Sequence, residues 1–433
     1  MKIALFHNSY QTRGGEDSVF EIEATALRDY GHEVVTYHVN NASVLAGGNI
    51  TAKIKTAWQA PHNKASQHAI TEFLKQERPD ISHVHNWFPL LSPSIYTAHQ
   101  AADVGVVQTL HNYRLGCAAA TFRRNGTDCT QCLTGSNCNA VKNRCYNNSL
   151  AGSIAWKRIM DRNWNNGTFT KGVDHYICPS REIYERHRQL GLPEERMSIV
   201  PNACPDARAL DVSPQHHNKL QVCFVGRLVP EKGAHVLIQA WLQLDTLTRA
   251  QCQLNIIGEG PEAQRLQAMA QEDPSIVFQG VLTHRNTLKK LCASHLLICP
   301  SLWAEPFGLT VIEAMSAGIA VIASELGGPA EIVIPNQTGR LFPADNHTAL
   351  HAMMQAMLNA PQELKHMGQA GRQRYLNDYT QAAHATELTN CFHSVIETRL
   401  SQASRTQPHS PVWSPLPQLL NANGLNGQTS ELR

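Results

Sequence analysis

The chain has 433 residues and a formal net charge of +2 at pH 7. Such a length allows two or three domains, each with its own core, and the near-neutral balance argues against nucleic acid as a partner. No apolar run approaches the ~18 residues that span a bilayer, and the short apolar start at residues 3–6 is unlike a signal peptide. We therefore expect a cytoplasmic protein whose twelve cysteines are mostly reduced, buried thiols.

Strands and helices alternate through the first half of the chain, which predicts a parallel sheet with helices on both faces. We assign residues 1–205 to this first Rossmann-like domain. Its strands are expected at 3–7, 33–38, 81–85, 105–110, 175–179 and 198–201, and its helices at 17–30, 67–76 and 150–164.

The alternation restarts near residue 220, which predicts a second doubly wound domain over residues 206–400. Residues 401–433 are rich in Pro, Ser, Asn and Gln and are expected to be disordered. Two such domains leave a cleft at the carboxyl ends of their strands, where open α/β sheets bind ligands. Strands are expected at 220–225, 253–257, 276–279, 296–300 and 320–324, with helices at 309–317 and over 348–400.

The segment from 305 to 310, Glu-Pro-Phe-Gly-Leu-Thr, leads from a predicted strand into a predicted helix. The free N–H groups at that helix start can hold a phosphate, aided by the helix dipole. Glu313 lies little more than a turn further on and suits a ribose diol, because a carboxylate can accept two hydrogen bonds. Glu305 could accept from sugar hydroxyls in the same way. The alternative is that Glu305 caps the helix and Glu313 is a solvated charge.

Two cations follow the first strand of the second domain. Arg227 and Lys232 lie in one short loop between Gly226 and Gly233, and two cations at a strand end can clamp a diphosphate. The alternative is an exposed basic loop. In the first domain Gly14 and Gly15 follow the first strand, but a glycine pair is weak evidence beyond a tight turn.

His111 ends a predicted strand of the first domain and could donate a hydrogen bond to a sugar or assist an acceptor. The chain has 22 histidines, so a structural role is the default for any one of them. His83 and His85 end another strand, with a less clear role. Because no Asp-x-Asp pair is present to hold a divalent cation, we expect catalysis without a metal or other cofactor.

These residues together resemble the family-four retaining glycosyltransferases of the GT-B fold. The resemblance is dense from 177 to 342 and thinner from 1 to 170. It implies two Rossmann-like domains facing across a cleft, a UDP- or GDP-sugar donor, and transfer of a hexose with retention. The motifs are Gly-Arg-Leu-x-x-Glu-Lys-Gly at 226–233, Gly-x-Gly-Pro at 258–261 and Glu-Pro-Phe-Gly-Leu-x-x-x-Glu-Ala-Met at 305–315.

The resemblance also implies roles for single residues. Arg227 and Lys232 would bind the donor pyrophosphate and stabilise the leaving nucleotide, and Glu313 would hold the ribose. His111 would lie against the transferred sugar near the reacting carbon. Other donor contacts are implied for Glu305 and the backbone of Phe307, Gly308 and Leu309 at the sugar, for Gly15 at the phosphates and for Val281 at the base.

A cysteine-rich segment, 116–148, interrupts the first domain and is expected to be a large loop. Cys129 and Cys132 form a Cys-x-x-Cys pair, with Cys117 before it and Cys145 after it. This spacing is typical of structural zinc, and a metal could supply folding energy that the few apolar residues cannot. The alternative is a set of free thiols. The segment resembles an insertion in some bacterial polysaccharide-building members of the family, which favours a role in acceptor recognition.

The acceptor is inferred less directly. Basic residues outnumber acids between 105 and 172, and a helix there carries four large apolar residues, which favours a lipid-linked saccharide and peripheral association with the inner face of a membrane. A nucleotide-sugar epimerase, a sugar phosphorylase and a catalytically silent nucleotide-sugar binding protein remain the alternatives. The apolar residues of the helix are Ile154, Trp156, Ile159 and Trp164.

Overall fold

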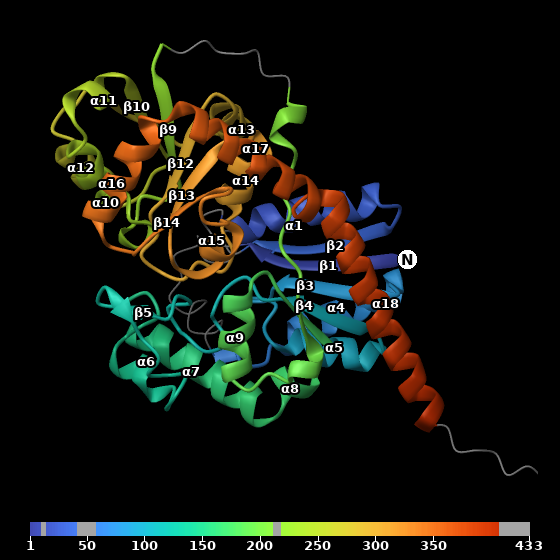
Figure 1. The fold of residues 1–433 in the computed structure, drawn as a ribbon. Coiled ribbons are helices and arrows are strands. Elements are labelled where there is room, and N and C mark those ends of the chain that lie inside the picture. Colours follow the sequence, from blue (N-terminus) through green and yellow to red (C-terminus); the bar gives the residue numbers. More distant parts are fainter. Residues whose placement is uncertain (10–13, 41–57, 211–217, 407–433) are drawn as a thin grey trace, which may run out of the picture.

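The computed structural model describes residues 1–9, 14–40, 58–210 and 218–406. They form two α/β domains, one built on each of two six-stranded parallel sheets. In Figure 1 the second domain lies above the first, and the last helix runs back from the second domain along the first. The predicted alternation of strands and helices is thus confirmed.

The first sheet has the strand order β2-β1-β3-β4-β7-β8, so the strand order reverses beside β1. Ile3 pairs with Val34 of β2 on one side and with Ile81 of β3 on the other. The strands are β1 (Lys2–Ser9), β2 (Glu33–Asn40), β3 (Ile81–Asn86), β4 (Gly105–Thr109), β7 (His175–Cys178) and β8 (Met197–Ile199), and the helices are α1 (Gly15–Asp29), α4 (Lys64–Glu77), α5 (Ser94–Ala102), α7 (Leu150–Asn165), α8 (Thr168–Lys171) and α9 (Arg181–Gln189), with a 3-10 turn at Glu194–Arg196.

The second sheet has the order β11-β10-β9-β12-β13-β14, and its order reverses between β9 and β12, where doubly wound sheets place their ligand crevice. The strands are β9 (Leu220–Val225), β10 (Cys252–Ile257), β11 (Ile276–Gly280), β12 (Leu296–Cys299), β13 (Ala320–Ser324) and β14 (Gly339–Phe342), and the helices are α10 (Ala234–Leu242), α11 (Thr246–Ala250), α12 (Ala263–Met269), α13 (His284–Cys292), α14 (Leu309–Ala317), α15 (Gly327–Ile332), α16 (His347–Leu358) and α17 (Pro361–Asp378), with 3-10 turns at Ala207–Ala209 and Pro230–Lys232.

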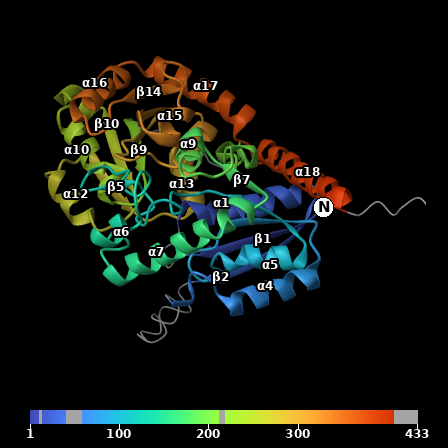
Figure 2. The ribbon, with the colours of Figure 1, turned by 90° about the horizontal axis from the view of Figure 1, so that it is seen from below.

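The last helix, α18 (Gln381–Thr406), belongs to the first domain by its packing. Its apolar residues Ala385, Leu388, Phe392 and Val395 recur at helical spacing and are buried against α1 and the first sheet. Figure 2 shows α18 extending from α17 past α1. The predicted boundary placed residues up to 400 in the second domain, and the helix also continues beyond that boundary. The tail predicted to be disordered lies outside the described residues from 407 onward.

The cysteine-rich insertion is not only loop. It contains a short hairpin, β5 (Arg123–Arg124) with β6 (Thr127–Asp128), and the helix α6 (Cys138–Lys142). Ala118, Phe122 and Ala140 are buried in the core of the first domain. Packing therefore supplies part of its stability, contrary to the expectation that its few apolar residues could not.

The helix α7 buries two of the four apolar residues that we expected to face a lipid, whereas Ile154 is exposed. Trp156 and Ile159 are fully buried, and the indole N–H groups of Trp156 and Trp164 donate to the backbone oxygens of Arg114 and Leu115. Its apolar face therefore supports the segment after β4. None of the described helices is both long enough and apolar enough to cross a bilayer.

Candidate active site

The two domains meet at the starts of two helices. A Cβ added to Gly15, at the start of α1, would lie 3.3 Å from Leu309 Cδ1, at the start of α14. The first N–H groups of a helix have no partner within it and attract anions. The sequence predicts the donor phosphates at this place, and the geometry is compatible with that.

The start of α14 depends on one glycine. Gly308 caps the helix with φ 118°, a value that strains other residues, and an added Cβ would meet Pro329 at 3.0 Å. No side chain caps the helix, so its first N–H groups remain open to a ligand. Phe307 is buried, and its backbone packs against Gly328 of α15, where an added Cβ would lie 1.9 Å from the Phe307 oxygen.

Glu305 and Lys232 lie in direct contact. Lys232 Nζ is 2.8 Å from Glu305 Oε1, and Ser301 also donates to Glu305. Glu305 is buried, so the lysine neutralises a carboxylate that would be costly alone. The structure thus places these two predicted residues together, on the loops that follow β9 and β12.

Arg227 and Val281 differ from that pair because they are exposed. Arg227 projects from the turn after β9, and Val281 is 68% exposed after β11. Both lie at carboxyl ends of strands in the second sheet, in which β10 separates β9 from β11. They are therefore accessible to a ligand, and neither is needed for the core.

Glu313 has a partner that sequence reasoning missed. Its Oε1 lies 2.7 Å from His284 Nε2, from the start of α13, and its side chain is almost fully buried. It is therefore not the solvated helix charge of the alternative interpretation. The signal for His284 was a histidine in the first turn of a helix that begins just after a strand.

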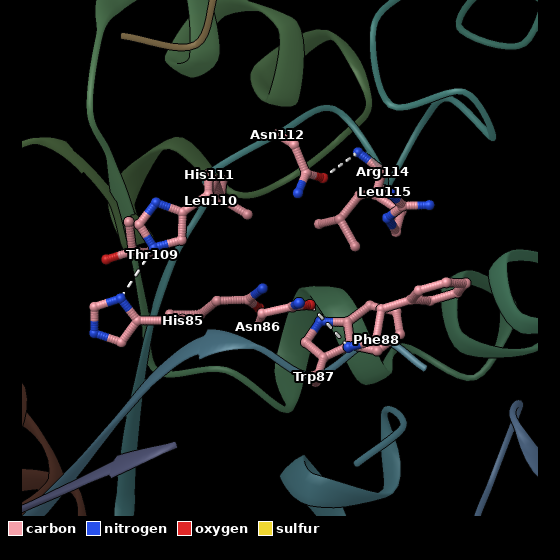
Figure 3. Close-up of a pocket in the computed structure, with 11 residues that line it drawn as sticks. His85, Asn86, Trp87, Phe88, Thr109, Leu110, His111, Asn112, Arg114 and Leu115 are labelled. Carbon is pink, nitrogen blue, oxygen red and sulfur yellow. Dashed lines mark hydrogen bonds between the residues drawn. The ribbon is translucent and has the colours of Figure 1, made fainter. Parts of the chain in front are cut away.

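His111 lines a small cavity at the ends of β3 and β4, shown in Figure 3. His85 and His111 point toward each other, with His85 Nδ1 3.0 Å from His111 Nε2. Burial lowers the pKa of His111 well below its ordinary value, so its ring is neutral. The cavity is lined by His85, Asn86, Trp87, Phe88, Gln108, Thr109, Leu110, His111, Asn112, Arg114 and Leu115.

Glu16 is a further cleft residue that sequence reasoning missed. It follows Gly15 in the first turn of α1, and Asn112 donates to its carboxylate at 3.4 Å. Burial raises the pKa of Glu16 to about 7, against the opposing charge of Arg114. The carboxyl group is thus poised to lose a proton near neutral pH.

Two groups of side chains have the chemistry of metal ligands. Among the described residues, Glu23, His83 and His85 alone bring three ligand atoms within 4.8 Å of one another. Glu23 Oε1 already lies within hydrogen-bond distance of both imidazoles, at 2.5 and 3.1 Å, so we interpret this group as a hydrogen-bond network.

The other group is the set of four predicted thiols. Burial raises the pKa of Cys132 to about 11, and the neighbouring thiols of Cys117, Cys145 and Cys129 add to the rise. The four sulfur atoms are thus near one another, although no three of them lie as close as the ligand atoms above. Cys138 is exposed.

Two contacts fasten the loop that carries Glu305 to the first domain, and a third joins the helix α15 to it. The Tyr113 hydroxyl donates to the Ala304 oxygen at 2.9 Å, and the Ser180 hydroxyl donates to the Pro306 oxygen at 2.6 Å. The Glu331 carboxylate accepts from the N–H groups of Arg181 and Glu182 at the start of α9, both at 2.8 Å. The cleft is therefore held closed around the loop that carries Glu305.

Comparison with known proteins agrees with this geometry. Residues 13–208 match the model of Glycosyltransferase Family 4, and residues 208–374 match that of Glycosyl transferases group 1. Glycogen synthase of Mycobacterium tuberculosis is 27% identical over 322 residues, 73% of this chain and 69% of the relative. Phosphatidyl-myo-inositol mannosyltransferase of Mycolicibacterium smegmatis is 24% identical and covers 82% of this chain and 83% of its own.

Solved structures share the fold. Sucrose-phosphate synthase of Thermosynechococcus elongatus aligns with a TM-score of 0.66 at 22% identity, over 92% of this chain and 99% of that one. Anabaena HepE, solved with UDP and glucose, aligns with a TM-score of 0.63 at 16% identity, over 91% and 100%. Two family models that together span both domains, and a shared GT-B architecture, lead to one conclusion: the chain belongs to the family-four glycosyltransferases.

Proposed function

We propose that this protein transfers a hexose, with retention, from a UDP- or GDP-sugar to a saccharide or lipid-linked saccharide during synthesis of a cell-surface polysaccharide. The observation that carries the proposal is the pair of Lys232 and Glu305. A cation and a carboxylate 2.8 Å apart suit the junction of a sugar diphosphate, where a phosphate oxygen and sugar hydroxyls are also neighbours.

The chemistry follows from where charge develops. The nucleoside diphosphate leaves with growing negative charge, which Lys232, Arg227 and the open N–H groups of α14 would stabilise in a closed site. These groups replace the divalent cation that other transferases use, so transfer needs no metal. Glu305 and Glu313 would accept hydrogen bonds from the sugar and the ribose.

Relatives support a nucleotide-linked donor and leave the base open. HepE was solved with UDP and glucose. A GDP-mannose-dependent α-mannosyltransferase of Mycolicibacterium smegmatis is 33% identical over 239 residues, 53% of this chain and 58% of its own. The binding test therefore includes both UDP and GDP.

A thermal-shift screen against UDP, GDP, ADP and their sugars, with and without EDTA, tests the proposal. A bound ligand raises the melting temperature by mass action, so one nucleoside diphosphate is expected to give a clear shift that EDTA leaves unchanged. Product from that sugar donor, analysed by NMR at its anomeric carbon, then reports retention. No shift with any nucleotide would overturn the proposal.

The acceptor proposal rests on an exposed strip of α7. Leu150 is 48% exposed and Ile154 42% exposed, and one helical turn further Arg158 stacks 4.2 Å over Trp58, which is 70% exposed. Apolar side chains, a tryptophan and a cation on one helix face suit the surface of an anionic membrane. We place this strip at the inner face of the membrane, in the cytoplasm.

Vesicle flotation tests the membrane contact. At low salt, wild-type protein is expected to float with vesicles that contain phosphatidylglycerol and to remain behind with vesicles of phosphatidylcholine alone. Arg158→Glu should abolish flotation, and Arg188→Glu on α9 serves as the control of equal charge change. Flotation that Arg158→Glu leaves intact would contradict this surface.

We further propose that Cys117, Cys129, Cys132 and Cys145 bind one structural zinc. A cation would relieve the mutual repulsion of four neighbouring thiolates. The ring of Phe122, inside the insertion, lies 5.2 Å from that of Tyr113, which in turn bonds the Glu305 loop. The insertion therefore sits beside the cleft, where it would shape acceptor recognition.

A further inference from the structure

A buried network of histidines surrounds one carboxylate inside the first domain. Glu23 Oε1 lies 2.5 Å from His83 Nδ1 and 3.1 Å from His85 Nε2, and Glu23 Oε2 lies 3.2 Å from His384 Nε2. The four side chains are at least 96% buried. They come from α1, β3 and α18, so the network joins the returning helix to the sheet edge that carries the cleft.

The charge of Glu23 is fixed by its neighbours. Burial would raise the pKa of Glu23, but His83, His85 and His384 outweigh burial and hold the pKa well below its ordinary value. His384 Nδ1 contacts the backbone oxygen of Pro201 at 2.7 Å, so both its nitrogens face oxygens that only accept. Both nitrogens of this ring are therefore placed to donate, and one of the two contacts is with the buried carboxylate.

The network sets the direction of the next two hydrogen bonds. An ionised carboxylate only accepts, so His85 carries its proton on Nε2. Burial lowers the pKa of His85 to about 4, and a neutral imidazole has one proton. His85 Nδ1 must therefore accept, and the proton in the 3.0 Å contact belongs to His111 Nε2. The neutral ring of His111 is then left with a bare Nδ1.

We propose that Glu23 and His85 are positioning residues that hold His111 in the tautomer with a bare Nδ1, which serves as a hydrogen-bond acceptor in the cleft. Figure 3 shows the second ring nitrogen of His111 on the side away from His85. The inference rests on the transferase function proposed above and specifies the role of His111 in it. His111 accepts a hydrogen bond from a sugar hydroxyl and would repel a carboxylate. This replaces the expectation that His111 donates.

The described groups around Glu23, His85 and His111 do not oppose the direction of these hydrogen bonds. His83 Nε2 is 2.7 Å from Thr109 Oγ1, which can either donate or accept. The ring of His7 lies 6.2 Å from that of His85, and His7 Nε2 instead contacts Asp17. Within the part of the chain that the structure describes, no other titratable side chain hydrogen-bonds to His85 or His111.

Nitrogen-15 NMR of histidine rings tests the tautomer without reference to activity. In wild-type protein labelled at histidine, His111, assigned by comparison with His111→Gln, is expected to show a protonated Nε2 and a bare Nδ1. Glu23→Leu removes the acceptor at similar volume and should protonate Nδ1 in part of the molecules. A protonated Nδ1 in the wild type, or an unchanged bare signal in Glu23→Leu, would overturn the inference.

Kinetics provide the second readout. Glu23→Leu should lower kcat/KM for the sugar donor about tenfold, the worth of one hydrogen bond, with unchanged affinity for the nucleoside diphosphate, because only the sugar is proposed to contact His111. Glu23→Gln should lose less, because its amide oxygen can stay toward His85 while its N–H group donates to His384 Nε2, with the His384 proton then on Nδ1 toward Pro201. His83→Asn, in the same network but without contact to His111, controls for packing. If the protein has the expected tautomer but no transferase activity, the proposed function is refuted and the inference about the tautomer stands.

Discussion

Lys232 Nζ lies 2.8 Å from Glu305 Oε1, and this contact joins the loop after β9 to the loop after β12. Glu305 is only 6% exposed, so the lysine stabilises the fold and also stands where the donor diphosphate is proposed. The Lys232–Glu305 pair therefore affects both the stability of the protein and the proposed chemistry, and substitutions can separate these two effects.

Lys232→Met is expected to lower kcat by about 10²–10³-fold, as for the loss of one group that stabilises developing charge. It should also destabilise the protein by about 3 kcal/mol, because Glu305 remains buried without its cation. Adding Glu305→Gln should restore the melting temperature but not transfer. Thermal melts and initial rates of the three variants check this, and recovery of transfer in the double variant would contradict the assignment.

A second prediction concerns the closed cleft. Glu331 accepts from the first N–H groups of α9 across the domain interface, so Glu331→Ala removes a charged cap and should cost about 1 kcal/mol. We expect weaker binding of the sugar donor as well, measured by calorimetry, because the closed arrangement is less populated. Glu325→Ala, at another exposed glutamate nearby, should change neither quantity.

The second domain was the more predictable part of the fold. The strands 220–225 and 320–324 and the helix 309–317 have the predicted bounds, because each is a short apolar run with a glycine or a charged turn beside it. The order of strands in the sheet and the return of α18 to the first domain depend on contacts between distant residues. Local pattern does not encode these, although the apolar spacing of 385, 388, 392 and 395 is visible in the sequence.

The same distinction explains the site. Arg227, Lys232, Glu305 and Glu313 stand out because each follows a strand or begins a helix. The partners that define their chemistry, such as His284 beside Glu313 and Tyr113 beside Ala304, lie 29 and 191 residues away in the chain. The Glu23–His85–His111 chain likewise requires three elements, so the sequence could single out His111 and the strand-end residues His83 and His85 but not their link to Glu23.

A third prediction addresses the insertion. Purified protein is expected to contain close to one zinc per chain by mass spectrometry, and EDTA should lower its melting temperature without ligand. Cys132→Ser should lose the zinc and lower the melting temperature, whereas Cys138→Ser, at an exposed thiol, should keep both. If the purified protein contains no zinc and the two variants have the same melting temperature, the insertion is held by packing of Phe122 and Ala140 and not by a metal.

Acid should unfold the protein steeply. Burial lowers the pKa of His85, His99 and His187 to about 4, while the ordinary value of an unfolded histidine is about 6.5. Between these values the unfolded chain binds more protons, so stability present above pH 6.5 is lost as pH falls toward 4. Three such groups give about 4 kcal/mol per pH unit.

Urea unfolding at pH 4.5, 5.5 and 6.5 measures that slope. His187 is a suitable probe because it is fully buried and lies outside the network around Glu23, with Nδ1 donating to the Ile183 oxygen at 2.8 Å. His187→Gln keeps a donor and should reduce the slope by about 1.4 kcal/mol per pH unit, one proton. His68→Gln, at an exposed histidine, should leave it unchanged. Equal slopes in all three proteins would contradict the shift at His187.

For Glu16 we expect the opposite dependence, in which its contribution to stability falls as the pH rises. Burial raises its pKa from 4.5 to about 7, so its contribution to stability is fully present below pH 4.5 and is lost as pH rises through 7. Glu16→Gln should therefore leave stability unchanged at pH 4.5 and raise it by about 1–3 kcal/mol at pH 8, the lower figure reflecting screening by solvent.

Ionisation of Glu16 should also weaken binding of the donor nucleotide. Glu16 begins α1 beside Gly15, which meets the start of α14, so an ionised carboxylate there repels a nucleoside diphosphate in the cleft. In wild-type protein the affinity for that nucleotide, measured by calorimetry, should weaken between pH 6 and 8. Glu16→Gln should flatten the profile and bind as tightly at pH 8 as at pH 6. A profile equally steep in the variant would assign the proton to another group and remove Glu16 from the donor site.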